Sequence, residues 1–83
     1  MKTMERTMVE MLRAYVNQLN DEEIEYACTK SEYSHGKMMA LEEIVTKFCM
    51  VLDVTWYCQM KTAYTGDNYT EWSLEESDLE FDY

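Results

Sequence analysis

The sequence is short of basic residues and of glycine. Its 83 residues hold 7 Lys and Arg against 17 Asp and Glu, which gives a net charge of −10. Clustered Lys and Arg supply most of a protein's affinity for phosphate backbones and anionic lipids, so the shortage argues against direct binding of nucleic acid or membrane. Two glycines also cannot form the Gly-rich loop that cradles a bound phosphate.

The usual core-forming residues are scarce as well. Leu, Ile, Val and Phe together supply 15 residues, and such scarcity with a high net charge is typical of disordered chains. Eight Met, seven Tyr and two Trp compensate, because Met fills irregular gaps and aromatic rings bury much area. We therefore expect one small folded domain with an acidic surface.

Disulfides and membrane segments are not expected either. Three widely spaced cysteines make an odd count, unlike the even framework of small secreted domains, so reduced thiols are expected. No run of 18 apolar residues occurs, and residues 1–6 lead into a patterned helix rather than into the apolar core of a signal peptide. These features predict a cytoplasmic protein.

The first half of the chain shows helical periodicity. Residues 1–19 place apolar side chains at spacings of three and four, which predicts a helix with one apolar face: Met4, Met8, Met11, Leu12, Tyr15 and Leu19. Residues 17–20 resemble a helix end. Asn20 could cap a second, short helix, with Glu23 completing a capping box. The two signals together predict a break in the helix near residue 20.

A further helix is predicted from residue 37 to residue 52, with Ser34 as its cap. Its periodic apolar residues include four that we expect to be buried together: Leu41, Ile44, Phe48 and Leu52. Residues 54–62 are β-prone in composition, but a fourth helix is the favoured interpretation. The predicted fold is therefore all-α, a compact bundle of three to four short helices.

A turn at residues 65–68 divides the chain, since Gly and Asn tolerate a positive φ. Residues 1–64 are predicted to form the helical domain, and residues 65–83 an acidic, aromatic-bearing tail that is extended or irregular.

Four residues have metal-ligand chemistry: Cys28, His35, Cys49 and Cys58. A Cys₃His set can hold zinc, but no C-x-x-C pair is present, and Cys49 falls within an apolar helical stripe where it would serve as a small hydrophobe. The single His has no Ser or Cys at a recognisable nucleophile spacing. The sequence therefore predicts no metal, no cofactor and no enzymatic activity.

The tail carries most of the net charge. Residues 63–83 contain seven carboxylates and no Lys or Arg, and the last eight residues alternate acidic and mostly apolar side chains. In an extended strand, alternate residues lie roughly 6.7 Å apart on one face. Phosphates along one DNA strand are roughly 7 Å apart through space. A row formed by Glu76, Asp78, Glu80 and Asp82 could therefore imitate a phosphate backbone, with Leu79, Phe81 and Tyr83 as its apolar side.

In size, acidity and lack of catalytic motifs, the chain resembles small acidic inhibitors of phages and mobile elements, namely anti-CRISPR and anti-restriction proteins, some of which mimic DNA. The resemblance is one of composition and covers no aligned motif. It implies a non-catalytic inhibitor in the host cytoplasm that occupies the basic nucleic-acid groove of a Cas9-type effector or a restriction nuclease. The partner-binding residues expected from the tail are Asp67, Glu71, Trp72, Glu75, Glu76, Asp78, Leu79, Glu80, Phe81 and Asp82.

Other interpretations of the same sequence stay open. The tail could be a solvated segment that aids solubility. The whole chain could be a small helical adaptor that binds a protein through an apolar face, or an oligomeric sponge for a small ligand such as a nucleotide. The sequence does not specify an oligomeric state.

Overall fold

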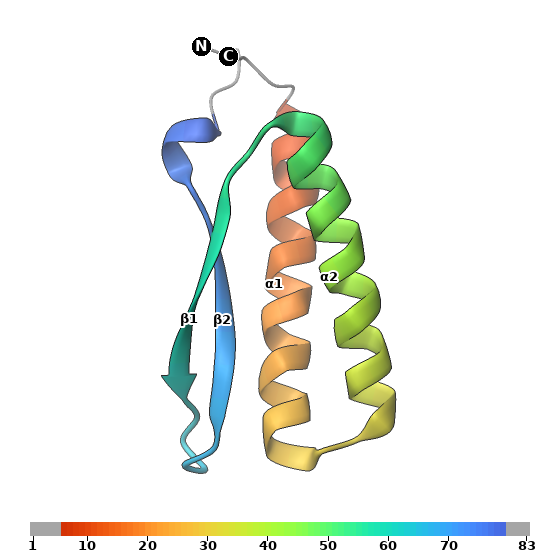
Figure 1. Cartoon of the computed structure of the whole chain (residues 1–83), viewed down its shortest axis with the longest axis vertical. Coiled ribbons are helices and arrows are strands. Elements are labelled where there is room, and N and C mark those ends of the chain that lie inside the picture. Colours follow the sequence, from red (N-terminus) through yellow and green to blue (C-terminus); the bar gives the residue numbers. More distant parts are fainter. Residues whose placement is uncertain (1–5, 80–83) are drawn as a thin grey trace.

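Two long helices and a β-hairpin make up the fold. The structure, a computed structural model that describes residues 6–79, contains α1 (Arg6–Thr29), α2 (Glu32–Leu52), β1 (Trp56–Thr62), β2 (Asn68–Leu74) and the short 3₁₀ helix η1 (Glu76–Asp78). The hairpin lies beside α1, and β2 is the strand that packs against this helix, with the two strands crossing in the view of Figure 1. The expected all-α bundle of three to four helices is therefore wrong, because the chain is α+β.

α1 does not break near residue 20. It continues to Thr29 and ends at Lys30, whose left-handed backbone (φ 56°) lets its N–H donate to the Tyr26 carbonyl at 2.8 Å. The cap of α2 is Ser31 rather than Ser34, since the Ser31 hydroxyl accepts from the Ser34 N–H at 3.4 Å. The predicted stop at Asn20 is wrong because that side chain bonds to β2 instead of to its own backbone.

Residues 56–62 form a strand rather than a fourth helix. Their aromatic and β-prone composition finds an antiparallel partner in residues 68–74, in a register that runs from Trp56 opposite Leu74 to Thr62 opposite Asn68. The predicted turn between them is confirmed, with Gly66 at φ 92°. β2 and η1 thus fall within the segment 65–83 that was expected to be a tail.

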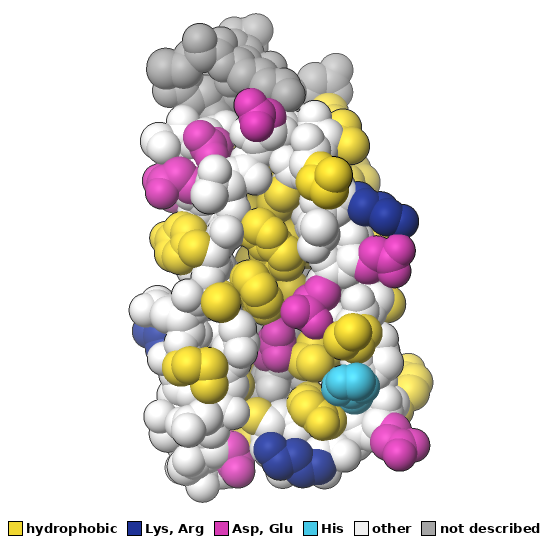
Figure 2. Space-filling model, viewed as in Figure 1, with side chains coloured by type: hydrophobic (Ala, Val, Ile, Leu, Met, Phe, Trp, Pro, Cys, Tyr) yellow, Lys and Arg dark blue, Asp and Glu magenta, His cyan; other side chains and the backbone are white. Residues whose placement is uncertain are grey.

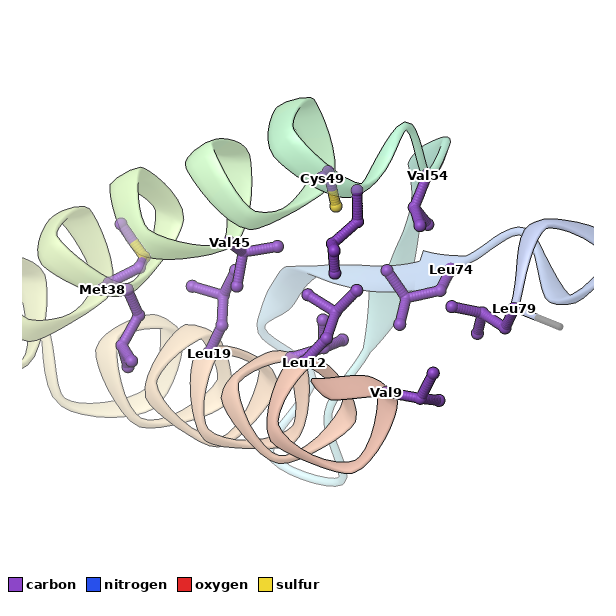
Figure 3. Packing of buried hydrophobic residues seen from close by; sticks show 12 residues of the cluster. Val9, Leu12, Leu19, Met38, Val45, Cys49, Val54, Leu74 and Leu79 are labelled. Atoms are coloured by element: carbon purple, nitrogen blue, oxygen red, sulfur yellow. The ribbon is translucent and has the colours of Figure 1, made fainter. Parts of the chain in front are cut away.

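The core lies between the two helices and the inner face of the hairpin. Figure 3 shows side chains of both helices meeting Val54, Leu74 and Leu79, which come from the later part of the chain. The most deeply buried large side chains are Val9, Leu12, Leu19 and Val45.

The predicted core of the second long helix is half right. Leu41 and Leu52 are buried, whereas Ile44 and Phe48 are only half-buried. Phe48 lies at the edge of the core against Tyr15, with ring centroids 5.7 Å apart. The centre of the helical face therefore passes through Val45 and Cys49 instead.

Two adjacent residues of α1 test this core. Leu12 is fully buried and Met11 is 44% exposed. Leu12→Ala should lower the free energy of unfolding by about 2 to 5 kcal/mol, because it leaves a cavity among packed side chains. Met11→Ala is the matched control and should cost under about 1 kcal/mol. Urea titrations monitored by circular dichroism measure both, and equal losses would contradict the assigned helix face.

Candidate functional site

Acidic side chains gather where α2 ends and β2 leaves the hairpin. We call this group, Asp53, Glu75, Glu76 and Asp78, the acidic end. It is organised around Thr55, whose carbonyl accepts from the Glu75 N–H at 2.9 Å and whose N–H donates to the Asp78 carboxylate at 2.8 Å. Figure 2 shows acidic side chains close together at this end of the molecule. Backbone pairing therefore brings the C-terminal carboxylates next to the end of α2.

The four carboxylates differ in how much charge they offer to a partner. Glu76 is exposed but forms a two-bond ion pair with Arg13, at 2.9 and 3.3 Å. Asp78 is half-buried and engaged with the Thr55 N–H. Asp53 and Glu75 are exposed and take part in no ion pair within residues 6–79. These two carry the most accessible negative charge of the acidic end.

Trp72, expected to bind a partner, has a structural role. Its backbone N–H donates to the Asn20 side-chain oxygen at 2.7 Å, and its carbonyl accepts from the Asn20 amide at 2.9 Å. Its indole N–H donates to the Glu23 carboxylate at 2.8 Å, and its ring stacks on Trp56 with centroids 4.1 Å apart. We call the contacts of Asn20 and Glu23 with Trp72 the Trp72 clamp.

Glu23 is a buried carboxylate within this clamp. Burial raises its pKa above the ordinary value of 4.5, the indole hydrogen bond works in the opposite direction, and the nearby negative charge of Glu42 raises it further. The net upward shift means that the folded state holds the Glu23 proton more tightly than the unfolded chain does.

The structure separates the other predicted site residues. Asp67 accepts from Thr65 at 2.8 Å in the hairpin turn, at the opposite end of the molecule from η1 (Figure 1). Glu71 pairs with Lys61 on the neighbouring strand at 3.8 Å. Leu79 is buried in the core instead of being offered to a partner. Residues 80–82, which include three predicted contacts, lie outside the described residues.

The proposed row of phosphate-spaced carboxylates is not formed at its start. Glu76 and Asp78 belong to the 3₁₀ helix η1, which is not an extended strand. Sequence reasoning also missed Asp53, because it follows a helix rather than lying in the tail. A Leu-Asp pair at the end of a periodic stretch was the only available signal.

The four potential metal ligands do not converge. Cys28 contacts the Thr65 hydroxyl at 3.3 Å, and the His35 ring lies against Tyr26 with centroids 5.0 Å apart. Cys49 is buried in the core, and this burial raises the pKa of its thiol. Within residues 6–79, no group of three His, Cys, Asp or Glu side chains is arranged to hold a metal ion.

An open furrow of about 360 Å³ runs between α1 and the hairpin. Polar side chains dominate its walls, among them Arg13, Asn17, Tyr57 and Ser73. The Arg13 charge is already engaged by Glu76, which leaves the furrow without an unpaired cation for an anionic ligand.

The geometry defines a small α+β domain with an acidic end. No protein-family model, curated protein or solved structure matches this chain. Neither of the two long helices is long and apolar enough to cross a membrane. The function must therefore be inferred from surface chemistry.

The Trp72 clamp gives a pH-dependent prediction. Glu23→Gln keeps an acceptor for the indole N–H and removes a buried charge, so it should raise the free energy of unfolding at neutral pH. Because the folded pKa lies above the unfolded value, the penalty from charged Glu23 is absent below the unfolded pKa and grows as pH rises through the interval between the two. The advantage of the Gln variant should therefore vanish in acid.

Glu23→Ala is the control for that experiment. It leaves the indole N–H without its partner and should lower the free energy of unfolding by about 1 to 3 kcal/mol. Denaturant titrations of both variants across acidic and neutral pH give the comparison. A Gln variant less stable than wild type at neutral pH would show that the indole hydrogen bond to the charged form outweighs the cost of burial.

Proposed function

We propose that this protein is a non-catalytic inhibitor that binds a nucleic-acid-handling protein and covers part of its basic groove with the acidic end. The partner classes we favour are Cas9-type effectors and restriction nucleases, in line with the compositional resemblance to small acidic inhibitors. The chain carries a net charge of −10, and two of its exposed carboxylates come to one end of the fold: Asp53 lies two residues before Thr55, whose carbonyl accepts from the Glu75 N–H.

The observation that carries this proposal is that most of the described Lys and Arg side chains are already paired with carboxylates. Of the basic side chains in residues 6–79, all but Lys30 lie within ion-pair distance of a carboxylate: Arg6, Arg13, Lys37, Lys47 and Lys61. Lys30 lies over the Tyr26 ring, 5.8 Å from its centroid. Positive charge is thus neutralised locally, and the excess of carboxylates defines the field that a partner meets.

Such a field favours a basic partner for two reasons. Charge complementarity accelerates encounter and selects the orientation of docking, and it suppresses association with other acidic surfaces. A groove that holds nucleic acid is lined with Lys and Arg, so it offers the matching charge. The proposal rests on the local density of carboxylates at the acidic end. It does not rest on a row with phosphate spacing, because Glu76 and Asp78 belong to η1.

A helical adaptor is the second candidate, and one observation favours it. The outer surface of α2 exposes Tyr33 (75%), Met39 (53%) and Met50 (76%), which are large apolar side chains of the kind found in interfaces. Binding through this surface should be nearly insensitive to salt. Binding through the acidic end should weaken steeply between low and high ionic strength.

A charge-matched pair of variants tests the proposed site. Asp53→Asn/Glu75→Gln removes two charges at the acidic end, and Asn tolerates the left-handed backbone of residue 53 (φ 57°). The control, Asp21→Asn/Glu25→Gln, removes two exposed charges from α1 and changes the net charge equally. Against a Cas9-type effector or a restriction nuclease that the wild type inhibits, the first variant should bind about tenfold more weakly, and the control about as well as the wild type.

The measurement is competition with fluorescent target DNA at several salt concentrations, together with thermal melting of each variant. Equal losses in both variants would reduce the effect to net charge and would remove the acidic end as the binding site. Inhibition that does not depend on salt would support the adaptor instead.

A further inference from the structure

The outer edge of β1 has backbone groups that point away from β2. The Glu75 N–H donates to the Thr55 carbonyl and the Ala63 N–H donates to the Asp67 carbonyl. In this register the backbone N–H and C=O groups of the odd-numbered residues of β1 point toward β2. Because backbone direction alternates along a strand, the N–H and C=O groups of Cys58 and Met60 point outward. The outward direction of Trp72, which lies opposite Cys58, agrees with this assignment.

Of the two outer edges of the hairpin, only the β2 edge is hydrogen-bonded to another described element. On the β2 side, the Asn20 amide covers the edge by bonding both the N–H and the carbonyl of Trp72. On the β1 side, no hydrogen bond from another described element to β1 backbone is present, and every residue after Trp56 is exposed. An open edge of this kind is a template for another strand.

β1 has few of the features that protect edge strands from pairing. It contains no proline, no glycine and no carboxylate, although the chain has 17 Asp and Glu, and its register shows no bulge. Its one charge is Lys61. Tyr57 (49%) and Met60 (67%) expose large apolar surfaces on its two faces. Figure 1 shows β1 farther from the helices than β2 over the part of the hairpin nearer its turn, and the two strands cross toward the end of α2.

We propose that β1 pairs antiparallel with β1 of a second copy, giving a symmetric dimer with a continuous four-stranded sheet. The register with the greatest overlap places Gln59 opposite Gln59 of the other copy and Cys58 opposite Met60. In this register the outward-facing groups of Cys58 and Met60 bond each other across the two-fold axis.

The side chains of β1 favour a second copy of this chain as the partner. An acidic strand from another protein would find only one complementary charge on β1, that of Lys61. In the proposed register each Lys61 lies opposite Tyr57 of the other copy, so no like charges face each other. The two Gln59 amides can exchange hydrogen bonds, and the apolar Met60 meets Cys58. Residues 57–61 of each edge thus find compatible neighbours in the same sequence.

The helices leave room for this arrangement. The two copies of β2 would be separated by three strand spacings, about 14 Å, and α1 lies on the far side of each. Packed helices need only about 8 to 10 Å between their axes. The dimer therefore forms without a clash between the helical layers.

Sedimentation velocity of the full chain over a range of concentrations tests the proposal. We expect a reversible monomer–dimer equilibrium whose dissociation constant falls as salt is added, because each copy carries a charge of −10. Met60→Pro removes an outward N–H while sparing the β1–β2 ladder, and it should weaken the dimer at least tenfold with little change in circular dichroism. A wild type that stays monomeric at all concentrations, or a folded Pro variant that dimerises equally well, would overturn the proposal.

Crosslinking tests the register independently of whether the proline variant folds. In a Cys28→Ser background, Met60→Cys places a thiol opposite Cys58 of the other copy, at a Cα separation of about 5.5 Å that a disulfide can span. Oxidised glutathione, which is reduced as the disulfide forms, should convert this variant to a covalent dimer. Thr62→Cys is the matched control and should crosslink much more slowly. Equal crosslinking of the two variants would contradict the register and the proposed pairing.

Discussion

The contact between Trp72 and α1 determines how the hairpin sits on the helices. Asn20 and Glu23 lie three residues apart on the same side of α1, so one helix face binds the backbone and the indole ring of the same strand residue. A two-stranded hairpin is marginal by itself in water. Its attachment to α1 brings Leu74 and Leu79 into contact with the helical core, and the stacked Trp56 and Trp72 rings pack against the same cluster.

The same two side chains explain why the sequence predicted the helices only in part. Asn20 followed by Glu23 is a pattern typical of a helix start, because both side chains can bond free backbone N–H groups. Here the N–H groups of the helix are already bonded along α1, and the two side chains bond Trp72 instead. The sequence pattern thus indicates correctly that Asn20 and Glu23 form side-chain hydrogen bonds. It could not report a partner that lies about fifty residues away in sequence.

The strands were missed for a related reason. The composition of residues 56–62 is β-prone, but a strand is stable only with a partner, and residues 68–74 fall in the segment 65–83 that the sequence predicts to be an acidic, aromatic-bearing tail. The sequence predicts the turn at Gly66, but a hairpin also requires that the two flanking segments pair with each other. The accumulation of carboxylates near the C-terminus was visible in the sequence. The arrangement that brings these carboxylates toward Asp53 was not visible, because it depends on the hydrogen bonds of the Thr55 carbonyl and N–H.

The negative charge of the chain opposes the association of two copies, whereas the open edge of β1 favours it. The two features lie at different places in the fold, so both can act in one dimer. The acidic end lies where β1 begins and β2 ends, whereas the pairing edge runs along the length of β1. In an antiparallel pair of β1 strands, the two acidic ends would lie at opposite ends of the shared sheet, about 23 Å apart for strands of seven residues. That separation exceeds the screening length of about 8 Å at physiological salt, so the two ends repel each other little. A dimer built in this way would present two independent acidic ends. Added salt should strengthen the proposed pairing of copies and weaken the proposed binding to a basic groove, so the opposite signs of the two responses would separate the interactions.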